Sequence, residues 1–177
     1  ARVAGRHRLG GWGRREPPRG RGPERSAKGL QDRREPPTLR AYPSCEAVAA
    51  RLQKTNPRLS DARAAFLSQH WAAQNAAGEW AILGDPAHKK PSPLLYQVEE
   101  VLACWKQITA PVLWVEAEDT NMWQWMGPKP EARIEIDRRL GHLAKVSAQM
   151  MADAGHMLHH DQPEELARML EAFLLAP

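Results

Sequence analysis

The order of short apolar runs and amphipathic stretches in the second half of the chain most constrains its fold. A continuous apolar run over 112–115 follows a proline and leads into acidic residues, which is typical of a buried parallel strand. The pattern then predicts a helix over 130–142, a second strand over 144–151 and an amphipathic helix that begins near Pro163. Strand, helix, strand and helix in this order indicate an α/β fold with a parallel sheet.

The beginning of the last helix carries several helix-start signals. Asp161 is the predicted N-cap, and Pro163 lies in the first turn. Glu164 and Glu165 favour the positive end of the helix dipole. Apolar side chains then recur at helical spacing as far as Leu174, so this helix is expected to cover a hydrophobic core.

Three further amphipathic stretches precede the strand pattern. Their spacing predicts helices over 44–52, 60–76 and 96–107. We therefore expect a mainly helical region over 38–107, followed by an α/β region over 108–177.

The first 37 residues differ in composition from the rest. Residues 1–40 carry 12 basic and 4 acidic side chains, whereas residues 41–177 carry 13 basic and 17 acidic ones, so the net charge of +4 conceals a basic tail. Gly, Pro and Arg dominate residues 1–37, and so few apolar side chains are available that this tail is predicted to be disordered. An Arg-rich tail could bind nucleic acid, but base stacking needs aromatic side chains and Trp12 stands alone. A disordered tail without a nucleic-acid partner is the favoured interpretation.

Composition also excludes several classes of protein. No apolar stretch approaches the roughly 18 residues of a membrane span, and the basic N-terminus lacks the apolar core of a secretory signal. Cys45 and Cys104 are too few for a disulfide framework or a cysteine-rich zinc site. We therefore expect a cytoplasmic protein with no membrane partner and no cofactor.

Polar side chains follow both predicted strands. Glu118 and Asp119 come directly after the first strand, and His156 follows the second. Because the carboxyl ends of parallel strands meet at one edge of a sheet, an acid and the histidine can lie close together there. The acid could then orient the imidazole and stabilise its charged form, while the imidazole serves as a general base.

The segments Ile108–Asp119 and Asp153–Glu165, with the closing amphipathic helix, resemble the C-terminal part of the α/β-hydrolase family. In that family the catalytic acid follows a late strand with a Pro-Val-Leu-x-Val run. Its histidine lies in a Gly-His loop before a helix that begins with Pro-Glu. The resemblance implies that Asp119 is the acid, that His156 is the general base and that residues 42–107 correspond to the cap over the active site.

The sequence departs from the family pattern in three respects. Ala117 replaces the glycine that usually precedes the acid, and Glu118 competes with Asp119 for that role. The family's nucleophile lies in a G-x-S-x-G turn, and none of the six serines here has glycines two residues away on both sides. The resemblance therefore implies an incomplete α/β hydrolase that lacks the N-terminal nucleophile half and is inactive alone. Its small sheet should expose an unpaired edge through which the chain could self-associate.

Each tryptophan near the predicted site allows two interpretations. Trp71, Trp123 and Trp125 are candidates to line a pocket for a small-molecule substrate, although core packing explains tryptophans equally well.

The H-x-x-H-H-D segment over 156–161 suggests metal ligands. However, Asp161 has a capping role and no second histidine cluster completes a coordination shell, so no metal is expected. His159 and His160 are better explained as a polar turn.

Two other functions remain open at this point. The chain could be a non-catalytic binding module whose half-sheet pairs with another chain, or a basic-tailed nucleic-acid binder. The favoured hypothesis is a hydrolase that cleaves an ester or related bond with a nucleophile–His–acid triad.

Overall fold

In a computed structural model the chain has a mixed α/β fold, and the structure describes residues 22–34, 37–90 and 96–176. These residues belong to two compact units. We call 22–90 the N-terminal unit and 96–176 the C-terminal unit. In neither unit, within the described ranges, is any helix long and apolar enough to cross a membrane.

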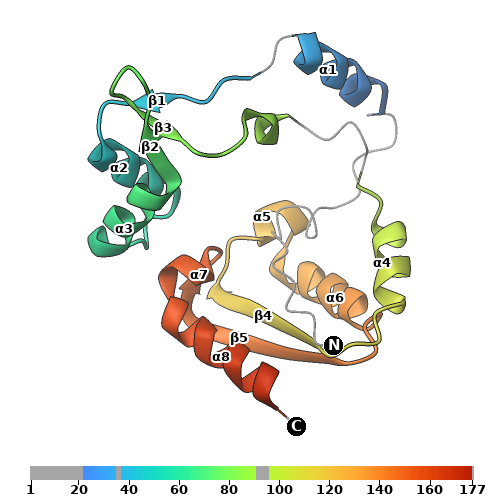
Figure 1. The fold of residues 1–177 in the computed structure, drawn as a ribbon. Helices are drawn as coiled ribbons and strands as arrows, with labels where there is room; N and C mark the ends of the chain where they lie inside the picture. The colour runs from blue at the N-terminus through green and yellow to red at the C-terminus, as the bar shows by residue number, and fades with distance from the viewer. Residues whose placement is uncertain (1–21, 35–36, 91–95, 177) are drawn as a thin grey trace. The chain divides into compact units, whose positions relative to one another are not determined.

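The C-terminal unit is built on two long parallel strands, β4 and β5 (Figure 1). Val112 pairs with Val146, and the register continues without interruption to Ala117 and Met151. The elements of this unit are α4 (Val98–Lys106), β4 (Val112–Asp119), α5 (Trp123–Met126), α6 (Lys129–Leu140), β5 (Val146–Gly155), α7 (Leu158–Asp161) and α8 (Pro163–Leu175). The predicted strand–helix–strand–helix order is confirmed.

Alternate residues of β4 face two different hydrophobic clusters, because side chains alternate along a strand. Val112 and Trp114 pack against a cluster formed mainly by α4 and α6, whereas Val115 packs with Ala117, Met151 and α8. Figure 1 shows α6 and α8 on opposite sides of the β4–β5 pair. The buried members of the first cluster are Val98, Leu102, Trp105, Met126, Ala132, Ile136, Leu140 and Leu143.

The boundary between the two regions differs from the one expected from the sequence. Helix α4 was expected to belong to the region over 38–107, but its buried Val98 and Leu102 pack with Ile136 of α6. The C-terminal unit therefore begins at Tyr96 and not at Ile108. The physical reason is that the apolar face of α4 packs against α6 and is buried there.

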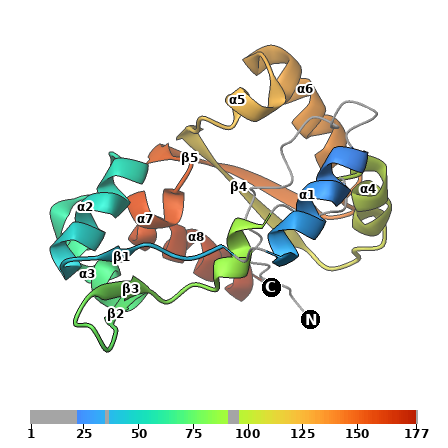
Figure 2. The same cartoon turned by 90° about the horizontal axis from the view of Figure 1, so that it is seen from above.

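The N-terminal unit contains a small sheet as well as the predicted helices. Its elements are α1 (Gly22–Arg34), β1 (Ala41–Tyr42), α2 (Cys45–Thr55), α3 (Asp61–Trp71), β2 (Ala72–Gln74), β3 (Trp80–Ile82) and a 3₁₀ turn, η1 (Pro86–Lys89). The strands form an antiparallel sheet in the order β1–β3–β2. Helices α2 and α3 lie side by side in both views (Figures 1 and 2), and the hydroxyls of Ser44 and Ser60 cap them.

The helix predicted over 60–76 ends at Trp71 because a tight hairpin follows it. The side-chain oxygen of Asn75 accepts the backbone N–H groups of Ala77 and Glu79, which closes the turn. Gly78 has a φ of 77°, a left-handed conformation that glycine adopts at little cost. These turn contacts pair β2 with β3 and prevent the helix from continuing.

The prediction of disorder over 1–37 does not hold for residues 22–34. Pro23 lies at the start of α1, and Glu24 lies in its first turn, where both residue types are favoured. Several good helix formers follow them. Residues 1–21 lie outside the described residues, and so does the predicted disorder there.

Candidate active site

The strands β4 and β5 end in an irregular pairing that places an acid opposite the histidine loop. After Ala117 pairs with Met151, the next pair is Asp119 with Gly155. One residue of β4 therefore faces three residues of β5, so that β5 bulges just before His156. The bulge sets the backbone of Asp119 beside the residue that precedes His156.

Asp153 lies at the centre of this bulge in a left-handed conformation, with a φ of 48°. Its backbone N–H donates to Glu118 Oε2 at 3.3 Å, and its carbonyl oxygen accepts from Gln162 Nε2 at 3.2 Å. Glu118 therefore has a structural part in the bulge. This contact engages Glu118 in the bulge, and the assignment of Asp119 as the acid of the site stays a prediction.

The left-handed backbone of Asp153 leads to a prediction about stability. Asp153→Gly and Asp153→Ala both remove the carboxylate, but only alanine keeps a Cβ that opposes a positive φ. We expect the alanine variant to have a free energy of unfolding about 1 kcal/mol lower than the glycine variant. Urea titrations of the two variants measure the difference, and equal midpoints would contradict it.

A buried carboxylate fixes the loop that follows the bulge. Asp161, which is 9% exposed, accepts the backbone N–H of Gly155 on Oδ2 at 2.8 Å. Asp161 was predicted to be the N-cap of the last helix, but Gln162 occupies that position. Asp161 is the last residue of the short helix α7, and its carboxylate faces back toward the end of β5. Asp161 thereby joins the two ends of the loop that contains His156.

The imidazole of His156 lies between a hydroxyl and an indole. Among the residues that the structure describes, its hydrogen-bond partner is Thr120, whose Oγ1 is 3.4 Å from Nδ1. The Trp125 ring lies at a centroid distance of 5.3 Å, inclined by 58°. Burial lowers the pKa of His156 below its ordinary value of 6.5, so the imidazole is neutral near pH 7 and available as a base.

The acid dependence of stability follows from the histidines of this loop. Burial lowers the pKa of His156 and of His160 in the folded chain, and the Asp161 carboxylate offsets burial only in part at His160. The folded state therefore binds protons less readily than the unfolded state. Above the pKa that these histidines have in the unfolded chain, near 6.5, their contribution to the stability of the folded chain is fully present. This contribution is lost as the pH falls below that value. We expect the free energy of unfolding, measured in urea between about pH 7.5 and about pH 5.5, to decrease with acidification. The doubly substituted H156Q/H160Q chain should decrease less, and an identical slope would contradict this assignment.

The structure brings together some of the predicted site residues and not others. Trp125, which is 43% exposed, contacts the ring of His156, and its place in a substrate pocket stays a prediction. Trp123 packs against the cluster of α4 and α6, with Lys129 5.7 Å above its ring, so it is a core residue in this structure. Trp71 belongs to the N-terminal unit, and its place in a substrate pocket stays a prediction.

The metal-site interpretation of the histidine segment finds no support. In the described ranges, no three His, Cys, Asp or Glu side chains are grouped so that they could hold a metal ion. The ring centroids of His159 and His160 are 4.1 Å apart, and the Asp161 carboxylate accepts a hydrogen bond from the Gly155 amide.

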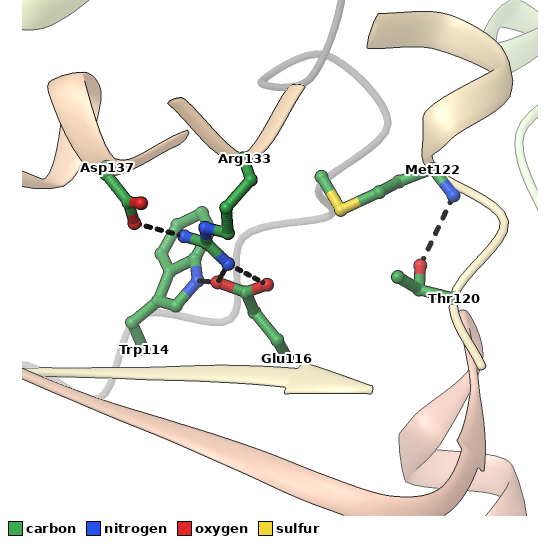
Figure 3. A network of polar contacts seen from close by, with 6 residues as sticks. All are labelled: Trp114, Glu116, Thr120, Met122, Arg133 and Asp137. Carbon is green, nitrogen blue, oxygen red and sulfur yellow. Dashed lines mark hydrogen bonds and ion pairs between the residues drawn. The ribbon is translucent and has the colours of Figure 1, made fainter. Parts of the chain in front are cut away.

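A buried ion pair beside the site was not predicted. Glu116, in the middle of β4, accepts from Arg133 Nη1 at 2.8 and 2.9 Å and from Trp114 Nε1 at 2.8 Å. Arg133 also pairs with Asp137 on the next turn of α6 (Figure 3). The network ties α6 to β4 just before the strand reaches Asp119. The available signal was a glutamate directly after the apolar run over 112–115, since a buried charge requires a partner.

The structure of the chain is similar to several solved structures. The chain is similar to the hypothetical protein PA1622 from Pseudomonas aeruginosa, with a TM-score of 0.72 and 20% identity over 92% of this chain and 55% of that one. It is similar to the thioesterase domain from the curacin biosynthetic pathway, with a TM-score of 0.69 and 19% identity over 88% of this chain and 53% of that domain. An α/β hydrolase from Novosphingobium aromaticivorans matches with a TM-score of 0.52 and 16% identity over 90% and 52% of the two chains. The chain has part of an α/β-hydrolase fold.

The chain spans about half the length of the solved structures that it matches. No protein-family model matches the sequence, and no curated protein does so either. The likeness therefore rests on structure. It agrees with the resemblance of the strand-end and histidine-loop segments to the α/β hydrolases.

Proposed function

We propose that this chain supplies the acid and the general base of a hydrolase that cleaves an ester or related bond in a small molecule. The observation that carries the proposal is the pairing of Asp119 with Gly155 at the carboxyl ends of two parallel strands, directly before His156. Loops at this edge of an α/β sheet are where reactive groups gather. The similarity in fold to a thioesterase domain and to an α/β hydrolase supports the same reaction class.

In the proposed reaction His156 removes a proton from the nucleophile and later returns it to the leaving group. Asp119 stabilises the imidazolium that forms between these steps. Trp125 would cover one side of the imidazole and line the pocket for the acyl or leaving group. The indole would also reduce the access of water to the ring, which would strengthen the electrostatic effect of Asp119.

No serine of the ranges 37–90 and 96–176 is placed as the nucleophile of this reaction would be. Ser44 and Ser60 cap helices, and Ser68 is buried, where its hydroxyl donates to the Ala65 carbonyl. Ser147 lies within β5. Ser44 lies between β1 and α2, but Tyr42 and Glu46 stand where a nucleophile elbow has glycines. The other three serines are not on a turn between a strand and a helix. We therefore propose that the chain alone has no hydrolase activity.

This proposal is tested with the purified chain and its His156→Ala variant. Both are incubated with p-nitrophenyl butyrate and with a fluorophosphonate probe that labels activated serines. Since any accessible imidazole slowly hydrolyses activated esters, the variant provides the background rate. We expect equal rates and no labelled serine. Turnover that is lost on replacing His156, or a labelled serine, would contradict the absence of a nucleophile.

A second candidate function is a non-catalytic binding module that pairs through its sheet. Among the described strands β4 pairs with β5 and with no other, which leaves its second edge without a strand partner. Sheet edges of this kind pair with other chains. In this case sedimentation equilibrium should show association that grows with concentration. A monomer at all concentrations would count against self-association and leave the hydrolase proposal untouched.

A further inference from the structure

Thr120, the first residue after β4, places a buried hydroxyl against the imidazole of His156. The residue is 8% exposed, and its Oγ1 lies 3.4 Å from His156 Nδ1. The same oxygen accepts the backbone N–H of Met122 at 3.3 Å, as Figure 3 shows. Nδ1 is the nitrogen that must be held for the other nitrogen, Nε2, to act as a base.

The hydrogen-bonding capacity of the hydroxyl limits how the protons can be arranged. A threonine hydroxyl has one proton and two lone pairs, and the Met122 N–H occupies one lone pair. If Nδ1 carries the imidazole proton, it donates to the remaining lone pair and leaves Nε2 unprotonated, and neither contact then uses the hydroxyl proton. If Nε2 carries the proton, the hydroxyl donates to Nδ1 instead. The first arrangement produces a base at Nε2, and the second does not.

We propose that Thr120 is a positioning residue that accepts the Nδ1–H of His156 and thereby keeps Nε2 free to act as a base. The inference rests on the proposed function only in taking His156 as the general base. Two further contacts hold the ring in place: the Trp125 indole 5.3 Å away and the Asp161 carboxylate on the Gly155 amide. The 3.4 Å separation is long for a hydrogen bond, and catalytic hydrogen bonds often shorten only when substrate binds.

The division of work with Asp119 follows from this placement. Thr120 is neutral, so it fixes which nitrogen carries the proton without favouring the charged imidazole. Asp119 is negative, so its proposed effect is on the stability of the imidazolium and hence on the pKa. The tautomer of His156 and the pKa of His156 are measured separately. The tautomer tests the role of Thr120, and the pKa tests the role of Asp119.

The tautomer is measured on the whole chain by nitrogen NMR of ¹⁵N-histidine-labelled protein, at a pH where His156 is neutral. His156→Gln identifies the resonances of His156 among those of the seven histidines. We expect the Nδ1–H form to predominate in the wild-type chain and in Thr120→Ser, which keeps the hydroxyl. In Thr120→Val, which keeps the branched shape, the ratio of Nδ1–H to Nε2–H should fall about fivefold, the equivalent of one ordinary hydrogen bond.

The results that overturn the inference are equally specific. A wild-type chain in which Nε2 carries the proton contradicts it directly, whether or not the valine variant folds. An unchanged ratio in Thr120→Val, with the fold retained in the backbone spectrum, contradicts it as well. Neither result bears on the pKa effect of Asp119, so the inference and the proposed function fail separately.

Discussion

Replacing Glu116 by alanine is expected to lower the free energy of unfolding by about 2–3 kcal/mol. The substitution leaves Arg133 without its buried partner and removes the acceptor of Trp114 Nε1. Breaking a fully buried ion pair costs about 3–5 kcal/mol, and the cost should be lower here because solvent reaches Arg133. The Arg133 side chain is 36% exposed, whereas that of Glu116 is 8% exposed. Denaturation in urea, with the tryptophan fluorescence as the signal, measures the loss.

Two matched variants separate the charge from the shape of this network. Glu116→Gln keeps an oxygen that can accept from Trp114 and Arg133, so it should cost only about 1 kcal/mol. The double variant E116L/R133M replaces the pair by apolar groups and should recover most of the loss, because no buried charge is then left unpaired. A double variant less stable than Glu116→Ala would contradict this explanation and show that the ion pair itself stabilises the fold.

Replacing Asp161 by alanine is expected to cost about 2 kcal/mol and to loosen the histidine loop. The variant leaves the buried N–H of Gly155 without its acceptor, and an unsatisfied buried donor costs about 1–3 kcal/mol. Asp161→Asn is the matched control, since its amide oxygen can still accept from Gly155. Hydrogen exchange at the Gly155 amide should become faster in the alanine variant and change much less in the asparagine variant. Equal exchange in the two variants would contradict a role for this hydrogen bond.

The C-terminal α/β core could be predicted from the sequence because its signals are local. The apolar run of β4 and the stripe of α8 each repeat within one element, at the spacing of a strand or of a helix. The strand-end positions of Asp119 and His156 followed from the same pattern. The pairing of Asp119 with Gly155 agrees with that expectation of position, and the catalytic roles of Asp119 and His156 stay a prediction.

The remaining features depend on contacts that local patterns do not report. The strands β1, β2 and β3 have 2 or 3 residues each, too few to show an alternating pattern. Asp161 has the residue type of an N-cap, but the bulge of β5 offers its carboxylate a buried amide instead. Thr120 carries no catalytic signature in the sequence, and its role depends on the loop that brings His156 beside it.

The most direct test of the proposed site is the pKa of His156, measured by NMR titration in the whole chain and in two matched variants. Asp119→Asn and Glu118→Gln each remove one negative charge, and each keeps an oxygen that can accept a hydrogen bond. If Asp119 is the acid of the site, Asp119→Asn lowers the pKa of His156, because the imidazolium loses a negative charge that stabilises it. Glu118→Gln should then change it much less, since Glu118 serves the Asp153 amide. An unchanged pKa in Asp119→Asn, or a larger decrease in Glu118→Gln, would contradict the assignment of Asp119 and His156 as the acid and base of a hydrolase.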